Sequence, residues 1–126
     1  MNSKIIYSVI FTTLILSLFS VKAAETHKTI PKIFQGKWTS NLKDCGMDDE
    51  TNLEIFKDHI SFYESSGPTI SIVTKQKNEL ALIIELSGEG EEWLSFVHFK
   101  INDKNNQLTD ITDAYEKNKL IRYRCK

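Results

Sequence analysis

The sequence contains few of the residues from which catalytic and metal sites are built. It has 2 Cys and 3 His among 126 residues. No two of these stand at the spacing of a metal site or of a Cys-x-x-Cys redox motif, and no serine lies in a Gly-x-Ser-x-Gly elbow. We therefore expect no catalytic residue, no metal and no cofactor, and we interpret His27, His59 and His98 as structural or surface side chains.

A dense group of basic side chains is also missing. The chain has 16 Lys and Arg against 17 Asp and Glu, and without residues 1–23 the balance is 14 against 17. Nucleic acids and anionic membrane surfaces are bound through clustered Lys and Arg. A weakly acidic protein of this kind is not expected to bind nucleic acid.

The longest apolar run lies at the N-terminus. Lys4 precedes an apolar stretch from Ile5 to Val21, which is followed by Lys22 and Ala23. A positive start, an apolar middle and a small residue at the end are typical of a secretory signal peptide, and the run is short for a membrane-spanning helix. We predict that residues 1–23 are removed and that residues 24–126 form one domain, periplasmic or secreted. No cysteine lies at the cleavage site, so neither a lipid nor another stable membrane anchor is expected.

The two cysteines, Cys45 and Cys125, lie near opposite ends of the predicted domain. An even number of cysteines in a small exported domain is typical of a structural disulfide. We predict that the two are paired, which closes a loop of about 80 residues and stabilises the fold by about 4 kcal/mol in the chain-entropy model. A reactive thiol pair is the alternative.

Apolar residues in the predicted domain recur with a period of two, which indicates strands. The most regular run is 79–86, in which Leu80, Leu82, Ile84 and Leu86 share one face; its other face is expected to be covered as well. Residues 64–68 are interpreted as a connection because they contain Gly and Pro, and residues 88–90 because they contain two Gly. The expected strands cover residues 36–40, 51–56, 59–64, 69–74, 79–86, 93–101, 108–112 and 119–125.

About eight short strands without an amphipathic helix predict an all-β fold. An antiparallel meander closed into a small barrel removes the exposed edges. One helical turn is expected at residues 30–34. We expect side chains such as Phe62, Leu82 and Ile84 to fill the interior. Three aromatic residues are also interpreted as core or barrel lining: Trp93, Phe96 and Phe99.

Both ends of the predicted barrel carry a pattern found in known proteins. Gly36-Lys37-Trp38 opens the first strand after a short turn, and Arg122 and Arg124 lie on the last strand. This arrangement resembles the lipocalin and calycin pattern. The resemblance implies that Trp38 closes one end of the barrel, that one of the two arginines lies across its indole ring, and that Gly36 permits their close approach. It also implies a carrier of a small hydrophobic ligand.

The chain is also similar to the small periplasmic barrels that inhibit secreted metalloproteases, in its length, its predicted export, its early Gly-x-Trp and the cysteine that follows. In that family the disulfide is local, whereas the bridge predicted here joins distant residues. Those inhibitors work through an extended N-terminal arm that reaches the metal of the protease. The resemblance implies that residues 24–29 form the corresponding arm; the alternative is an ordinary frayed N-terminal segment.

Carboxylates gather around one predicted turn, between Glu85 and Trp93. One interpretation is an acidic loop that meets a basic partner or holds calcium weakly. The other is a solvated hairpin turn whose charge discourages aggregation. The candidate partner-binding residues are Glu89, Glu91, Glu92 and Trp93. A second acidic group flanks Cys45 and has the same two interpretations: Asp44, Asp48, Asp49 and Glu50.

These observations favour a non-enzymatic binding or inhibitor module in the periplasm or outside the cell. The expected partner is an envelope or secreted protein of the protease or lysozyme class, because a basic lysozyme would be attracted by Glu89, Glu91 and Glu92. The alternative is a lipocalin-like carrier, for which a barrel of this size leaves only a small cavity.

Overall fold

The computed structural model describes residues 23–126. The predicted signal peptide, residues 1–23, lies outside the described residues except for Ala23. None of the helices in the described part has the length and apolar character needed to cross a membrane.

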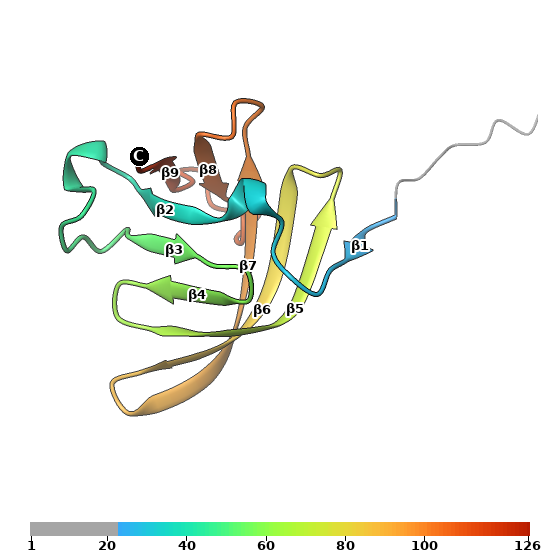
Figure 1. The fold of residues 1–126 in the computed structure, drawn as a ribbon, viewed down its shortest axis with the longest axis horizontal. Helices are drawn as coiled ribbons and strands as arrows, with labels where there is room; N and C mark the ends of the chain where they lie inside the picture. Colours follow the sequence, from blue (N-terminus) through green and yellow to red (C-terminus); the bar gives the residue numbers. More distant parts are fainter. Residues whose placement is uncertain (1–22) are drawn as a thin grey trace, which may run out of the picture.

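Eight antiparallel strands form a closed barrel in which each strand pairs with the next along the chain (Figure 1). The last strand, β9, pairs with the first strand of the ring, β2, through Trp38 with Arg124 and Thr39 with Tyr123. The predicted all-β meander barrel is confirmed. Its strands are β2 (Gly36–Thr39), β3 (Leu53–Ile55), β4 (His59–Phe62), β5 (Ser66–Lys75), β6 (Glu79–Gly88), β7 (Glu91–Ile101), β8 (Gln107–Asp110) and β9 (Ile121–Arg124).

The strands are unequal in length, and three of them are longer than predicted. β5, β6 and β7 have 10, 10 and 11 residues, whereas the other five have 3 or 4. The prediction that residues 64–68 form a connection is wrong for 66–68, which belong to β5. Gly67 lies so close to β6 that a Cβ atom on it would stand 1.8 Å from the Glu85 carbonyl oxygen. A glycine that resembles a turn residue in the sequence is required here for strand packing.

The N-terminal segment of the described chain is attached to the barrel. A strand that the sequence did not predict, β1 (Glu25–Thr26), pairs with Val73 and Thr74 of β5. The His27 N–H donates to the Ile72 carbonyl at 2.9 Å. Residues 24–29, the segment that corresponds to an inhibitory arm, therefore begin as an edge strand of the sheet.

The interior of the barrel is packed with apolar side chains. The predicted inward face of β6 is confirmed, because Leu80, Leu82, Ile84 and Leu86 are all buried. Its other face is not covered, since Ile83 is 39% exposed. The remaining buried apolar residues are Ile30, Phe34, Trp38, Leu53, Ile55, Ile60, Ile72, Val97, Phe99, Ile101 and Leu108, with Phe62 packed against them.

Two short 3₁₀ helices complete the fold. The first, η1 (Lys32–Phe34), lies within the predicted helical turn. The second, η2 (Leu42–Asp44), was not predicted and lies in the loop between β2 and β3. This loop brings Cys45 to Cys125, and the two form the predicted disulfide with Cα atoms 5.8 Å apart. The bridge ties the β2–β3 loop to the residues that follow β9.

Candidate functional site

One end of the barrel is closed by Trp38 and the residues around it. The indole is 1% exposed, and its Nε1 donates to the Phe34 carbonyl at 2.9 Å. The guanidinium carbon of Arg124 lies 4.2 Å from the centre of the indole ring, a cation–π contact. Arg124 also donates to the carbonyl oxygens of Ile33, Gln35 and Asn105. The polar groups of Trp38 and Arg124 thus bond to backbone carbonyl oxygens of the same chain, and these contacts stabilise this end of the barrel.

Gly36 lies next to Arg124, whereas Arg122 does not contact the indole ring of Trp38. Gly36 has φ +127°, and a Cβ atom on it would stand 3.0 Å from Arg124 Nη1. Arg122 is buried away from the indole ring, where its Nε donates to the Thr51 carbonyl at 2.6 Å. Burial lowers the pKa of Arg122, and the nearby Asp110 carboxylate opposes that shift. Of the two arginines that the sequence offered, the structure therefore places Arg124 over Trp38.

The β6–β7 hairpin connects the closed end of the barrel to the other end. At its base Glu79 pairs with Lys100, shortly before the chain passes through Asn105, whose carbonyl oxygen accepts from Arg124. At its tip the turn residues Glu89 and Gly90 have φ 49° and 78°. Positive φ at both positions suits a type I′ hairpin turn. The tip forms the lower left of the molecule in Figure 1.

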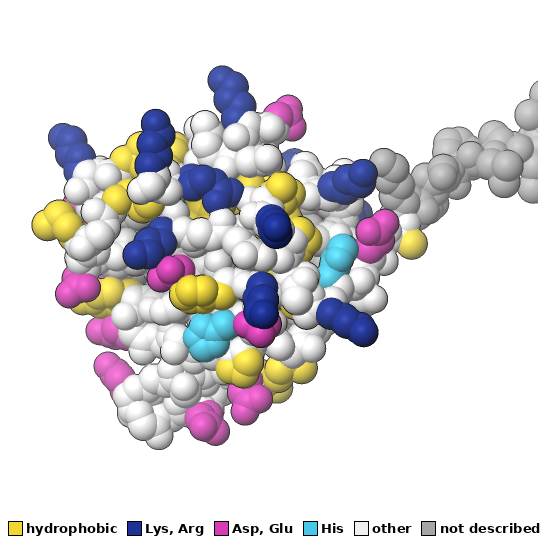
Figure 2. Space-filling view, in the orientation of Figure 1, with side chains coloured by type: hydrophobic (Ala, Val, Ile, Leu, Met, Phe, Trp, Pro, Cys, Tyr) yellow, Lys and Arg dark blue, Asp and Glu magenta, His cyan; other side chains and the backbone are white. Residues whose placement is uncertain are grey.

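The tip of this hairpin is acidic. Glu89, Glu91 and Glu92 are exposed, and the sequence has no Lys or Arg between Lys77 and Lys100. On the face shown in Figure 2, Asp and Glu side chains surround the lower end of the molecule, whereas Lys and Arg lie over its upper and middle parts. Within residues 23–126, no group of three His, Cys, Asp or Glu side chains is placed to hold a metal ion.

Large apolar side chains lie next to these carboxylates. Leu94 is 68% exposed and Phe96 is 53% exposed, both on the outer face of β7. The interpretation of Phe96 as barrel lining is wrong, because Phe96 and Phe99 are three residues apart and therefore lie on opposite faces of a strand. Trp93 has the same parity as the buried Phe99, yet it stays 41% exposed near the open tip.

The apolar residues on β7 continue across two neighbouring strands. Phe96 pairs across the ladder with the exposed Ile83 of β6. On β5, the register shifts between Thr69 and Ser71, and the extra residue at this bulge, Ile70, is 57% exposed. Ile70, Ile83, Leu94 and Phe96 are thus large apolar side chains exposed on three consecutive strands.

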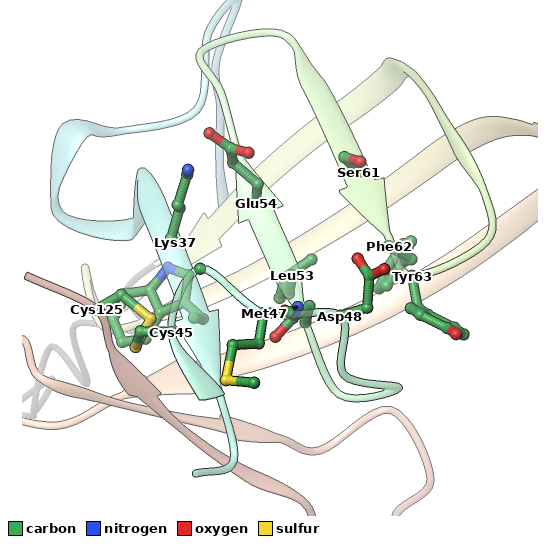
Figure 3. A pocket seen from close by; sticks show the side chains of 13 residues that line it. Lys37, Cys45, Met47, Asp48, Leu53, Glu54, Ser61, Phe62, Tyr63 and Cys125 are labelled. Carbon is green, nitrogen blue, oxygen red and sulfur yellow. Dashed lines mark hydrogen bonds between the residues drawn. A yellow bond between two sulfur atoms is a disulfide. The ribbon is translucent and has the colours of Figure 1, made fainter. Parts of the chain in front are cut away.

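A concave feature lies beside the disulfide, against β2, β3 and β4 (Figure 3). It is a cleft of about 290 Å³ in which Lys37 pairs with Glu54 and Glu54 pairs with Ser61 across the ladder. Met47 and Asp48 of the β2–β3 loop form its other side. No sequence pattern indicates this cleft, because only the strand register brings Lys37, Glu54 and Ser61 together.

The acidic group that flanks Cys45 is partly structural. The Thr51 hydroxyl and N–H donate to Asp49 Oδ1 at 2.5 and 2.7 Å, and these hydrogen bonds lower the pKa of Asp49. The hydrogen bond that Asp44 shares with Asp49 raises the pKa of Asp44, and partial burial and charge repulsion add to the shift. Asp49 therefore holds the loop in place. The folded structure stabilises the ionised form of Asp49 and disfavours that of Asp44.

The three histidines lie apart, each against a different neighbour. His98 Nε2 is 3.3 Å from Glu79 Oε2 on the adjacent strand, and His27 Nε2 is 2.7 Å from the Thr74 hydroxyl. The ring of His59 lies edge-on to Phe56 with their centres 5.8 Å apart. The structure does not bring them together into one site.

Comparison of the chain with known protein families, with curated proteins and with solved structures finds no match. The resemblance to lipocalins and to metalloprotease inhibitors therefore remains a prediction. It rests on the placement of Gly36, Trp38 and Arg124 at the closed end.

Proposed function

We propose that this protein is a non-enzymatic, exported binding module that recognises another protein through the tip of the β6–β7 hairpin. The observation that carries the proposal is the exposure of large apolar side chains beside a group of carboxylates. Exposed apolar surface rimmed by charged residues is typical of protein-interaction sites. We call this region the hairpin surface; it consists of Glu89, Glu91, Glu92, Trp93, Leu94 and Phe96.

The charge of the hairpin surface favours a basic partner. Carboxylates on a protruding turn attract basic proteins over a distance and suppress acidic ones. The disulfide between Cys45 and Cys125 supports an oxidising compartment such as the periplasm or the cell exterior. A basic lysozyme or a secreted protease from that compartment is the class of partner that we propose, with inhibition as the consequence of binding.

The packing of the interior speaks against the alternative function as a carrier. A carrier requires a cavity that covers most of the ligand surface. In this barrel the inward side chains of Leu80, Leu82 and Ile84 are all 0% exposed, and they occupy the middle of the interior. The packed interior supports a binding function on the outer surface instead.

Binding and inhibition assays with charge-matched variants test this proposal. The oxidised protein is titrated against a basic lysozyme and a secreted metalloprotease, and it is used to capture partners from envelope and secreted fractions. The test variant neutralises the hairpin surface: Glu89→Gln, Glu91→Gln and Glu92→Gln. The control variant neutralises three exposed carboxylates outside both acidic groups: Asp58→Asn, Asp103→Asn and Glu116→Gln.

We expect the wild type and the control variant to bind the same partner, and the test variant to bind it at least about tenfold more weakly at low salt. The difference should shrink as salt is added, since the attraction is screened. A test variant that binds as tightly as the control variant would contradict the proposal. So would a failure of the wild type to bind or capture any protein.

A further inference from the structure

One edge of β7 lacks a partner strand over most of its length. β6 pairs with β7 from Glu91 to Lys100, but on the other edge β8 pairs only with Phe99, Lys100 and Ile101. Next to this short ladder, the Ile111 N–H donates to the His98 carbonyl at 2.8 Å. Among residues 23–126, no strand pairs with residues 91–97 of β7 on this side. The chain after β8 therefore leaves the N-terminal part of this edge, residues 91–97, without a partner strand.

The pattern at His98 shows which backbone groups face the free edge. Both the N–H and the carbonyl of His98 point toward the β8 side, where they bond to Thr112 Oγ1 and to the Ile111 N–H. In an antiparallel strand the two groups of one residue face the same edge, and every second residue repeats this direction. The N–H and carbonyl groups of Glu92, Leu94 and Phe96 therefore face the uncovered edge.

Most of the usual protections of a sheet edge are missing at this position, and only Glu91 and Glu92 charge its end near the tip. Natural edges are blunted by Lys, by Pro, by bulges or by a covering segment, because an open edge pairs with other chains. Between Lys77 and Lys100 there is no Lys, Arg or Pro. The β6–β7 ladder runs without a register shift from Glu79 and Lys100 to Gly88 and Glu91. This edge of β7 is regular, exposed and ready to pair.

We propose that Glu92, Leu94 and Phe96 accept an extended segment of a basic partner as an added antiparallel strand, in line with β8. This inference rests on the proposed function and names the way in which the partner binds. Strand addition gives affinity through backbone hydrogen bonds and specificity through side chains on alternate positions. The exposed Leu94 and Phe96 offer apolar contacts to such a strand.

The charge of the hairpin decides between a basic partner and a second copy of this chain. Five glutamates and no Lys or Arg lie between Lys77 and Lys100. Two copies paired antiparallel over residues 92–96 would place Glu92 of each copy opposite Phe96 of the other, so neither carboxylate would meet a cation across the ladder. A segment with Lys or Arg between apolar residues instead complements both Glu92 and its apolar neighbours.

A synthetic strand tests the inference directly. The probe is a seven-residue peptide of alternating Lys and Val, titrated into the purified, oxidised, isotope-labelled protein. Two further peptides carry N-methyl groups on alternate backbone nitrogens, one on each edge of the extended chain. The measurements are the dissociation constant and the hydrogen-exchange protection of the β7 amides in the presence of each peptide.

We expect the unmodified peptide to protect the amides of Glu92, Leu94 and Phe96 and to change those of Trp93 and Ser95 little, because these two face β6. One methylated peptide should bind about tenfold or more weakly than the other, since only one edge of the probe meets β7. Equal affinity of the two methylated peptides would overturn strand addition, as would absence of binding.

The remaining outcomes separate this inference from the proposed function. Protection of the same three amides by self-association, without peptide, would overturn the assignment to a basic partner and show a second copy instead. A natural partner that requires Glu89, Glu91 and Glu92 but leaves the Leu94 and Phe96 amides unprotected would overturn strand addition alone. A natural partner that binds the charge-neutralised protein unchanged would instead overturn the proposed function.

Discussion

The two tryptophans of this chain lie at opposite ends of one barrel and have opposite surroundings. Trp38 is 1% exposed and is held by the Phe34 carbonyl and the Arg124 guanidinium, whereas Trp93 is 41% exposed beside a free strand edge. At the closed end, polar groups bond to other groups of the same chain. At the hairpin end, apolar side chains and carboxylates face the solvent. The residues that stabilise the fold and the residues that we propose for recognition therefore lie at different ends of the same small sheet.

The charges of the two ends differ in the same way. Arg122 and Arg124 are removed from water in part, and this desolvation lowers the pKa of both. They remain charged at neutral pH and donate to backbone carbonyl oxygens. The glutamates of the hairpin surface are exposed, so their charge acts outward. The cations of one end hold the fold together, while the anions of the other end face the solvent.

Truncation of each tryptophan is the strongest test of this comparison. Trp38→Ala should lower the free energy of unfolding by about 3 to 5 kcal/mol, because it leaves a large cavity at the closed end. The matched Trp93→Ala should cost less than about 1 kcal/mol, since most of its contacts are formed near the surface. Denaturant unfolding of the two variants measures the difference. Equal losses would remove the distinction between the two ends.

Opening the disulfide should have the next largest effect. Replacement of Cys45 and Cys125 by Ala is expected to lower the free energy of unfolding by about 2 to 4 kcal/mol, because the unfolded chain regains the freedom of an 80-residue loop. Partner binding by the fraction that stays folded should not change, since the hairpin surface lies away from the bridge. A thermal midpoint that barely moves would show that the bridge contributes little to stability.

A pair of glycine variants sharpens the account of the closed end. Gly36→Ala should cost about 2 kcal/mol, because φ is +127° and the new methyl group would meet Arg124 Nη1 at 3.0 Å. Gly46→Ala has φ +83° and no neighbour within 4 Å, so only backbone strain of about 1 kcal/mol is expected. Thermal denaturation compares the two. A larger effect at Gly46 would show that contact with Arg124 does not govern the choice of Gly36.

The smallest expected effect on stability comes from the acidic residues of the β2–β3 loop, which carries Cys45. The pKa of Asp44 is raised in the folded protein, so its ionisation reduces stability as the pH rises. Asp44→Asn should therefore raise the thermal midpoint slightly at pH 7. The midpoint should not change at an acidic pH at which the Asp44 carboxyl is protonated and is therefore as neutral as Asn.

The neighbouring carboxyl should behave in the opposite way. The pKa of Asp49 is lowered, so its stabilising effect is present at neutral pH and is lost as the pH falls through its folded-state value. Asp49→Asn should therefore lower the thermal midpoint at pH 7. Thermal melts at the two pH values measure both variants. Shifts of the same sign would contradict the assignment of separate roles to Asp44 and Asp49.

Sequence patterns predicted the long strands and the core well, because alternation is a direct consequence of a strand buried on one face. The inward face of β6 was predicted residue by residue. The start of β5 was missed, since Gly67 and Pro68 have the composition of a turn, and the need for Gly67 arises only from the approach of Glu85. The two-residue β1 is too short and polar to show a period.

The candidate site was predictable only in part. The carboxylates of the β6–β7 turn are visible in the sequence, and so is the parity that places Phe96 outside and Phe99 inside. The free edge of β7 is not visible in the sequence. It depends on the point, after Ile111, at which the chain that follows β8 stops bonding to that edge. The cleft beside the disulfide depends in the same way on the register of Lys37 with Glu54. Tertiary pairing determines both features.

The pairing of β2 with β9 also has a consequence for the folding rate. It joins Trp38 to Arg124, so the ring closes through residues that are among the most distant in the described chain. Contacts of such long range are slow to form, because much of the chain must first be ordered. We expect the β5–β6–β7 hairpins to form early as local structure and the Trp38 end to form last. A chain that stopped before β9 would leave β2 and β8 as open edges, prone to aggregation.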